Sequence, residues 1–121
     1  MAELRQPPSI DAYGGGGFRV SGRRIEGSIL ILDDKLYSWP VASLAQLGPD
    51  DIAPVLAAGL SQVEFLLLGV GARVAPPPPA LRKVLQDAGL GLEVMDTATA
   101  ARVYNVLVSE GRRLAAALIA I

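Results

Sequence analysis

VEFLLLGVGARVAPPPPALRKVLQDAGLGLEVM, residues 63–95, is the stretch that decides the fold. Its first six residues, interrupted only by Glu64, form an apolar run typical of a strand buried on both faces. A helix follows the proline run and closes at Gly89; its apolar face consists of Leu81, Val84, Leu85 and Ala88. Residues 92–95 form a second apolar strand. The stretch therefore predicts a β-α-β unit with two parallel strands and a right-handed crossover.

The N-terminal third predicts antiparallel strands. Residues 1–16 contain two prolines and the first three of the four consecutive glycines 14–17, and we expect an extended arm that ends in a flexible Gly-rich loop. A strand from Phe18, a turn at Ser21-Gly22 and a strand over residues 25–32 predict a β-hairpin. After the next turn, residues 35–39 alternate polar with apolar groups, which completes an antiparallel meander.

The rest of the chain adds two helices and a strand. Asp50 and Asp51 favour a helix N-terminus, and Pro54 fits only its first turn. Thr97 can cap the last helix, which ends at Gly111, and residues 112–121 predict a strand. We predict a single domain over residues 1–121, of class α/β (α+β). Its order is β-β-β-α-β-α-β-α-β, a β-meander packed with a small mixed α/β sheet.

Composition excludes several classes of protein. The chain has 11 Lys and Arg against 12 Asp and Glu, which gives a net charge of −1. It therefore lacks the overall positive charge that attracts the phosphate backbone of a nucleic acid. The absence of His and Cys excludes Ser-His-Asp and Cys-His nucleophiles, thiol redox chemistry and the usual zinc sites. We therefore expect no metal and no cofactor, and an enzyme is the less favoured interpretation.

The N-terminus and the length of the apolar segments indicate where in the cell the protein is expected. The first residues include Glu3 and no apolar segment, which does not fit a signal peptide, so we expect a cytoplasmic protein. Residues 63–72 and 114–121 are shorter than the ~20 residues of a membrane-spanning helix, so we expect no membrane insertion. Open sheet edges leave both a monomer and a homodimer as alternatives.

Four stretches together resemble a known family: residues 14–19 leading to Glu26-Gly27-Ser28, residues 66–71, residues 94–97 and residues 101–112. The similarity runs over about residues 10–120. It is to a small family of uncharacterised domains that includes archaeal and bacterial single-domain proteins, a vertebrate adipogenesis-associated protein and a mitochondrial complex I assembly factor. The resemblance implies packed β and α/β layers and no established reaction. It also implies a role in assembling a respiratory complex or a membrane protein.

One group of candidate site residues lies where the two parallel strands end. Gly69 and Gly71 form half of a dinucleotide fingerprint, and the third glycine position is Val74, so a structural turn is favoured over a cofactor site. Arg73, Asp96 and Thr97 are expected beside this turn, where an open sheet offers a crevice. Helix capping explains Asp96 and Thr97 without a ligand and is the favoured interpretation; an anion or polar-substrate pocket is the alternative. Asn105 either binds backbone or contributes to a ligand site.

A second group lies on the first hairpin. Phe18, Arg19, Arg23 and Arg24 concentrate basic and aromatic groups, which suit a protein partner. Pairing of the arginines with nearby carboxylates is nevertheless the favoured interpretation, and a partner surface is the alternative. Trp39, the only tryptophan, is expected in the core or at a contact surface.

The sequence thus predicts a non-catalytic interaction or assembly module with an unknown protein partner and no nucleic acid. The alternative is a small-molecule or anion-binding domain, or a small enzyme, that uses the crevice between Gly69 and Thr97.

Overall fold

The structure is a computed structural model and describes residues 5–121. It contains eight strands, three α-helices and two short 3-10 helices. The strands are β1 (Ile10–Gly14), β2 (Gly17–Val20), β3 (Arg23–Glu26), β4 (Ser28–Leu32), β5 (Lys35–Trp39), β6 (Phe65–Gly69), β7 (Gly91–Met95) and β8 (Ala115–Leu118). The helices are η1 (Leu44–Gln46), η2 (Pro49–Ile52), α1 (Ala53–Ala58), α2 (Pro79–Asp87) and α3 (Thr97–Ser109).

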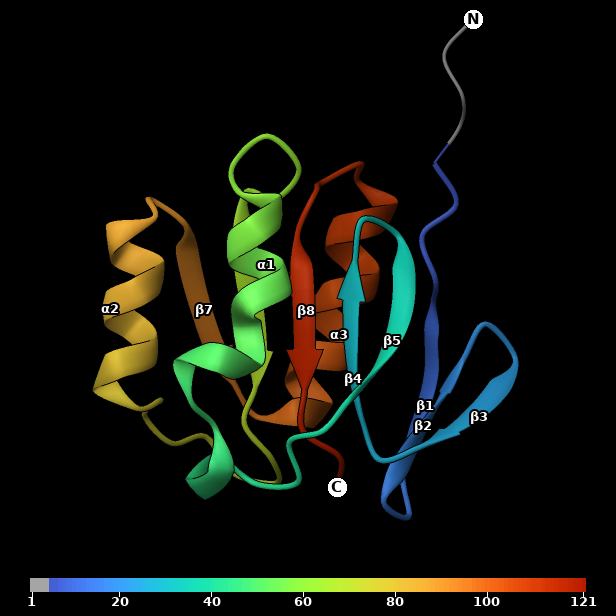
Figure 1. The fold of residues 1–121 in the computed structure, drawn as a ribbon. Coiled ribbons are helices and arrows are strands. Elements are labelled where there is room, and N and C mark those ends of the chain that lie inside the picture. Colours follow the sequence, from blue (N-terminus) through green and yellow to red (C-terminus); the bar gives the residue numbers. More distant parts are fainter. Residues whose placement is uncertain (1–4) are drawn as a thin grey trace, which may run out of the picture.

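The strands form two sheets, and the predicted fold class is confirmed. The small sheet is the antiparallel meander β1-β2-β3, and the larger one is a mixed sheet in the order β5-β4-β8-β6-β7. In the larger sheet β6 runs parallel to β7 and β8, whereas β4 runs antiparallel to β5 and β8. In Figure 1, α1 and α2 lie in front of this sheet and α3 lies behind it, next to the small sheet.

Alternating side chains of the central strands supply two separate cores. Leu66 and Leu68 of β6 face α1 and α2, while Leu67 faces α3 and the small sheet. On β4, Leu30 and Ile31 likewise point into different cores. Successive side chains of a strand point to opposite faces, so an apolar run covered on both sides is what a central strand requires. The buried position of residues 66–68 therefore follows directly from their sequence.

The β-α-β unit confirms the parallel pairing predicted from residues 63–95. Phe65 pairs with Gly91 and Gly69 with Met95 in a continuous parallel register. Pro79 occupies the first turn of α2, where a missing N–H costs nothing. Gly89 and Gly111 follow the last two helices at φ values of 74° and 83°, a conformation that favours glycine.

The N-terminal region differs from the expected extended arm. Ile10–Gly14 is a strand, β1, that pairs with β2, and of the expected Gly-rich loop only Gly15 and Gly16 form the turn between the two strands. The proline and glycine content obscured this strand, because its burial depends on α3, a helix about 90 residues away that no local pattern reveals. Residues 1–4 of the expected arm lie outside the described residues.

The strand expected over residues 25–32 is also divided. Gly27 adopts a φ of 82°, so the chain turns there and β3 and β4 join different sheets. The N-terminal region therefore contains five strands where three were expected. A glycine inside a strand pattern is the residue that permits such a break.

Candidate functional site

The ends of β6 and β7 meet the start of α3, as the sequence predicted, and Thr97 connects them. The Thr97 hydroxyl donates a hydrogen bond to the Ile119 carbonyl at 2.7 Å and accepts one from the Gly71 amide at 3.0 Å. The Thr97 amide donates to the Gly71 carbonyl at 2.8 Å. The side chain is fully buried at 0% exposure. Thr97 thus links three segments of the chain and presents no atom to solvent.

Asp96, rather than the expected Thr97, is the N-cap of α3, and it caps the helix with both of its carboxylate oxygens. One oxygen accepts from the Thr99 amide and the other from the Thr99 hydroxyl, each at 2.8 Å. These hydrogen bonds lower the pKa of Asp96 below its ordinary value, with the nearby Arg102 as a smaller cause. A general acid at neutral pH needs a raised pKa. The geometry therefore equips Asp96 for capping.

The two glycines beside Thr97 differ in the space around them. A side chain at Gly69 would lie 2.8 Å from the Leu118 side chain and 3.1 Å from Thr97, so glycine is required by close packing. Gly71 has open space around it and needs glycine for its φ of 117°. Arg73 is exposed, and no hydrogen bond or ion pair joins it to another residue in 5–121. Of the five candidate residues at this end of the sheet, Gly69 and Thr97 are buried, Gly71 and Asp96 are half-buried, and Arg73 is exposed.

Asn105 binds the backbone of the N-terminal strand. Its amide oxygen accepts from the Ile10 amide at 2.9 Å, and its amide nitrogen donates to the Ile10 carbonyl at 2.8 Å. The Asn105 side chain thereby makes the two hydrogen bonds that a neighbouring strand would make, and it fixes β1 to α3. The structure places Asn105 in this contact, away from Gly69 and Thr97.

The hairpin residues are divided between two faces of the small sheet. Phe18 is fully buried in the core beside α3, so its ring is not available to a partner. Arg19 pairs in register with Arg24, and these two share one face, whereas Arg23 pairs with Val20 and lies on the other. All three arginines are exposed.

Arg24 is occupied by local contacts. Its guanidinium donates to the carbonyls of Gly14 and Gly15 at 3.0 Å and forms an ion pair with Glu26 at 2.8 Å. Carboxylate pairing, one of the two alternatives for this cluster, therefore holds for Arg24. Arg19 and Arg23 form no ion pair within the described part of the chain.

Trp39 is buried at 4% exposure, and its indole N–H donates to the Asp51 carbonyl at 2.8 Å. It forms one wall of a hollow of about 450 Å³ between β5 and the start of α1. Tyr37, which is 45% exposed, lines the same hollow. The contact between strand and 3-10 helix explains the burial of Trp39.

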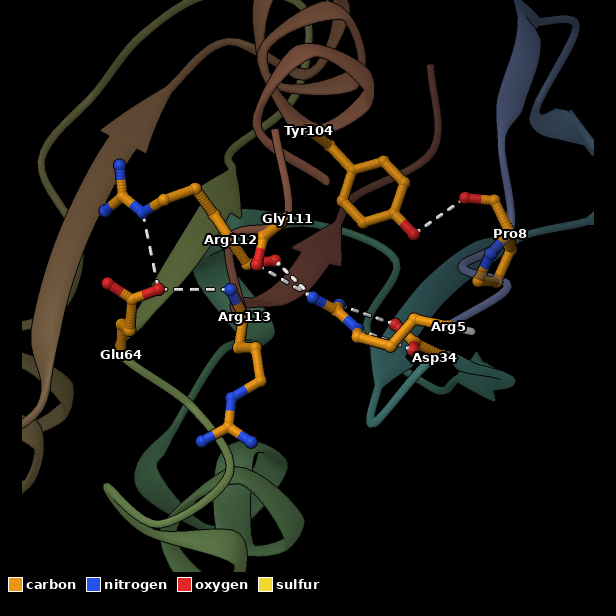
Figure 2. A network of polar contacts seen from close by, with 8 residues as sticks. All are labelled: Arg5, Pro8, Asp34, Glu64, Tyr104, Gly111, Arg112 and Arg113. Carbon is orange, nitrogen blue, oxygen red and sulfur yellow. Dashed lines mark hydrogen bonds and ion pairs between the residues drawn. The ribbon is translucent and has the colours of Figure 1, made fainter. Parts of the chain in front are cut away.

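Figure 2 shows a polar network that the sequence did not reveal. Arg5 forms an ion pair with Asp34 at 2.9 Å and donates to the carbonyls of Gly111 and Arg112. The Tyr104 hydroxyl donates to the Pro8 carbonyl at 2.7 Å, and burial raises the pKa of that hydroxyl. The network fixes residues 5–8 across the end of α3. Its members are separated by up to 107 residues, so no sequence motif connects them.

The described residues lack two kinds of feature. Between residues 5 and 121, no three or more acidic side chains gather closely enough to bind a metal ion. Over the same range, no helix has the length and apolar content needed to cross a membrane.

Comparison with known proteins identifies relatives over almost the whole chain. The family model described as "Protein of unknown function (DUF498/DUF598)" matches residues 10–119. An uncharacterized protein of Rhodobacter capsulatus is 44% identical over 110 residues, covering 91% of this chain and 82% of that protein. The NADH dehydrogenase [ubiquinone] 1 alpha subcomplex assembly factor 3 of Xenopus tropicalis is 34% identical over 111 residues. The match covers 91% of this chain and 60% of that factor.

A solved structure has the same fold. The crystal structure of an outer membrane protein from Bartonella henselae superposes with a TM-score of 0.88 at 35% identity. The superposition covers 94% of this chain and 95% of that one.

Proposed function

Because the chain belongs to the DUF498/DUF598 family, we propose that it is a non-catalytic module that assists the assembly of a respiratory NADH dehydrogenase through a protein partner. The observation that carries this proposal is its similarity to the NADH dehydrogenase assembly factor over 91% of the chain. The chain spans 60% of that factor's length. The role of the whole factor is therefore assigned to this chain only as a proposal.

The chemistry of the candidate residues supports a module without a catalytic step. Thr97, Asp96 and Asn105 direct their side chains to backbone or to a neighbouring hydroxyl, and Asp96 has a lowered pKa. Groups engaged in this way stabilise the fold and are poorly suited to proton transfer. Protein contact then depends on exposed groups such as Arg19 and Arg23.

The proposal is tested by deleting the gene in the organism that carries it. We expect the deletion strain to accumulate partly assembled NADH dehydrogenase, visible on native gels, and to lose NADH oxidation in isolated membranes. Succinate oxidation in the same membranes is the control, because its enzyme has a separate assembly. A deletion strain with a full complement of assembled NADH dehydrogenase would exclude the proposed role.

The same strain tests the hairpin as a partner surface. We expect the combined variant Arg19→Ala, Arg23→Ala and Arg24→Ala to remain folded and to fail to restore assembly, because truncated arginine anchors weaken protein interfaces. The matched control replaces Arg82 and Lys83 of α2, which are also exposed, by Ala. Full restoration by the triple variant would move the partner surface elsewhere and leave the assembly role itself standing.

The alternative proposal is a small-anion site at Gly71 and Arg73, supported by the open space at Gly71 and the exposed guanidinium of Arg73. Titration with inorganic phosphate, followed by the amide NMR shifts of residues 70–74, tests it. We expect saturable shifts that Arg73→Gln removes. Shifts that are identical in both proteins would exclude the site.

A further inference from the structure

The outer face of α3 carries an uncovered apolar patch. Val106 is 56% exposed, and Val103 and Leu107 beside it are half-buried. The patch continues into a hollow of about 330 Å³, where Val103 and Leu107 meet Phe65 of β6 and Met95 of β7. Glu93 and Arg112 form the charged rim of this hollow. Contiguous exposed apolar surface that a polar rim surrounds marks a site of contact with another macromolecule.

The position of α3 explains why this face is free. Its inner face, with Ala100, Ala101 and Tyr104, is buried against the sheet. One flank of the helix contacts β1 through Asn105. The other flank borders the hollow beside β7, which is an edge strand of the larger sheet (Figure 1). The apolar patch therefore lies on the part of α3 that its own domain does not cover.

Charges of opposite sign flank this patch symmetrically. Arg102 precedes Val106 by four residues and Glu110 follows it by four, so the three side chains lie along one stripe of the helix surface. Both charged residues are exposed, and neither forms an ion pair with another residue in 5–121. Arg102 makes one long hydrogen bond, to the Tyr13 hydroxyl at 3.3 Å.

The symmetric placement of these two charges indicates which molecule covers the apolar patch. A two-fold axis beside Val106 sets two α3 helices antiparallel, with Arg102 of each copy opposite Glu110 of the other. The same axis brings the two Val106 side chains together and places each near the other copy's Val103 and Leu107. A two-fold dimer requires a surface that is complementary to itself, and the charges of this face meet that requirement. We propose that the outer face of α3 is a homodimer interface that a second copy of this chain covers.

The first test measures the oligomeric state of the whole chain. We expect light scattering coupled to size exclusion to give a mass that rises with concentration toward twice the 12.6 kDa of one chain. Val106→Asp introduces two facing carboxylates at the axis and should keep the protein monomeric. Val74→Asp is the matched control, because Val74 is an exposed valine, 66% exposed, outside the patch. It should dimerise as the wild type does.

The second test exchanges the charges. Arg102→Glu places like charges opposite each other twice per dimer and should weaken dimerisation by roughly tenfold, as should Glu110→Arg. The double variant Arg102→Glu with Glu110→Arg restores opposite charges and should dimerise within about threefold of the wild type. Circular dichroism verifies that each variant keeps its fold, which is expected because all the exchanged side chains are exposed.

Three results would overturn the proposal. The first is a wild-type chain that stays monomeric at millimolar concentration. The second is a dimer that Val106→Asp and Val74→Asp weaken equally, which would place the interface elsewhere. The third is a double charge variant that is no better than the single ones, because an antiparallel α3 pair requires the exchange to restore binding.

Discussion

Thr97 shows at the scale of one residue how a candidate ligand group becomes a structural one. Thr97→Val keeps the shape and removes the hydroxyl, which leaves the Ile119 carbonyl and the Gly71 amide without their partner. A buried polar group without a partner costs about 1–3 kcal/mol, and we expect the free energy of unfolding in urea to fall by that amount. Thr97→Ser keeps the hydroxyl and should lose less. Equal losses for the two variants would show that the hydroxyl is not responsible.

The carboxylate of Asp96 gives a prediction about pH. Its pKa is lower in the folded protein than its ordinary value of 3.8, because it accepts hydrogen bonds from Thr99. Its stabilising effect is therefore fully present above pH 3.8 and is lost as the pH falls through the lowered value. We expect the wild type to exceed Asp96→Asn in melting temperature at pH 7, and the difference to shrink below pH 3.8. A difference that is independent of pH would contradict this account of the cap.

At the scale of elements, Gly27 separates two strands that the sequence pattern joined. Its φ of 82° is costly for other residues, although open space surrounds the position. Gly27→Ala should lower the free energy of unfolding by about 1–2 kcal/mol, the cost of a left-handed conformation. Gly48→Ala is the control, since Gly48 has an extended φ of −141° and should change stability by less than about 0.5 kcal/mol. If both variants behave alike, Gly27 does not require its conformation.

The elements that the sequence predicted well are those fixed by local pattern. Residues 63–95 indicated β6, α2 and β7, because apolar periodicity, prolines and a closing glycine all lie within one window. β1 was missed because its partners, β2 and Asn105, are set by tertiary contacts. The candidate site shows the same difference between features set by the sequence pattern and features set by tertiary packing. The meeting of Gly71 with Thr97 was predicted from topology, whereas the burial of Phe18 and the contact between Arg5 and Asp34 depend on packing that only the folded chain shows.

For the molecule as a whole, stability depends on the close packing of side chains at the centre of the larger sheet. Ala116 is fully buried on β8, opposite Leu67 of β6 and Ile31 of β4. Ala116→Leu should lower the free energy of unfolding by about 1–3 kcal/mol or more, because a packed core has no room for the added carbons. Ala12→Leu on β1 is exposed and should change stability by less than about 0.5 kcal/mol. Tolerance of leucine at Ala116 would show that the sheet can separate from its helices.

The central place of β8 also bears on how the protein is synthesised. β8 joins β4 to β6, yet residues 115–118 follow every other strand along the chain. While the ribosome translates the message, the nascent polypeptide therefore holds a β4–β5 hairpin and a β6–β7 pair that cannot yet combine. Each half has an open edge, and such edges recruit other chains. A premature stop codon before residue 115 would then yield an aggregating product rather than a smaller stable domain.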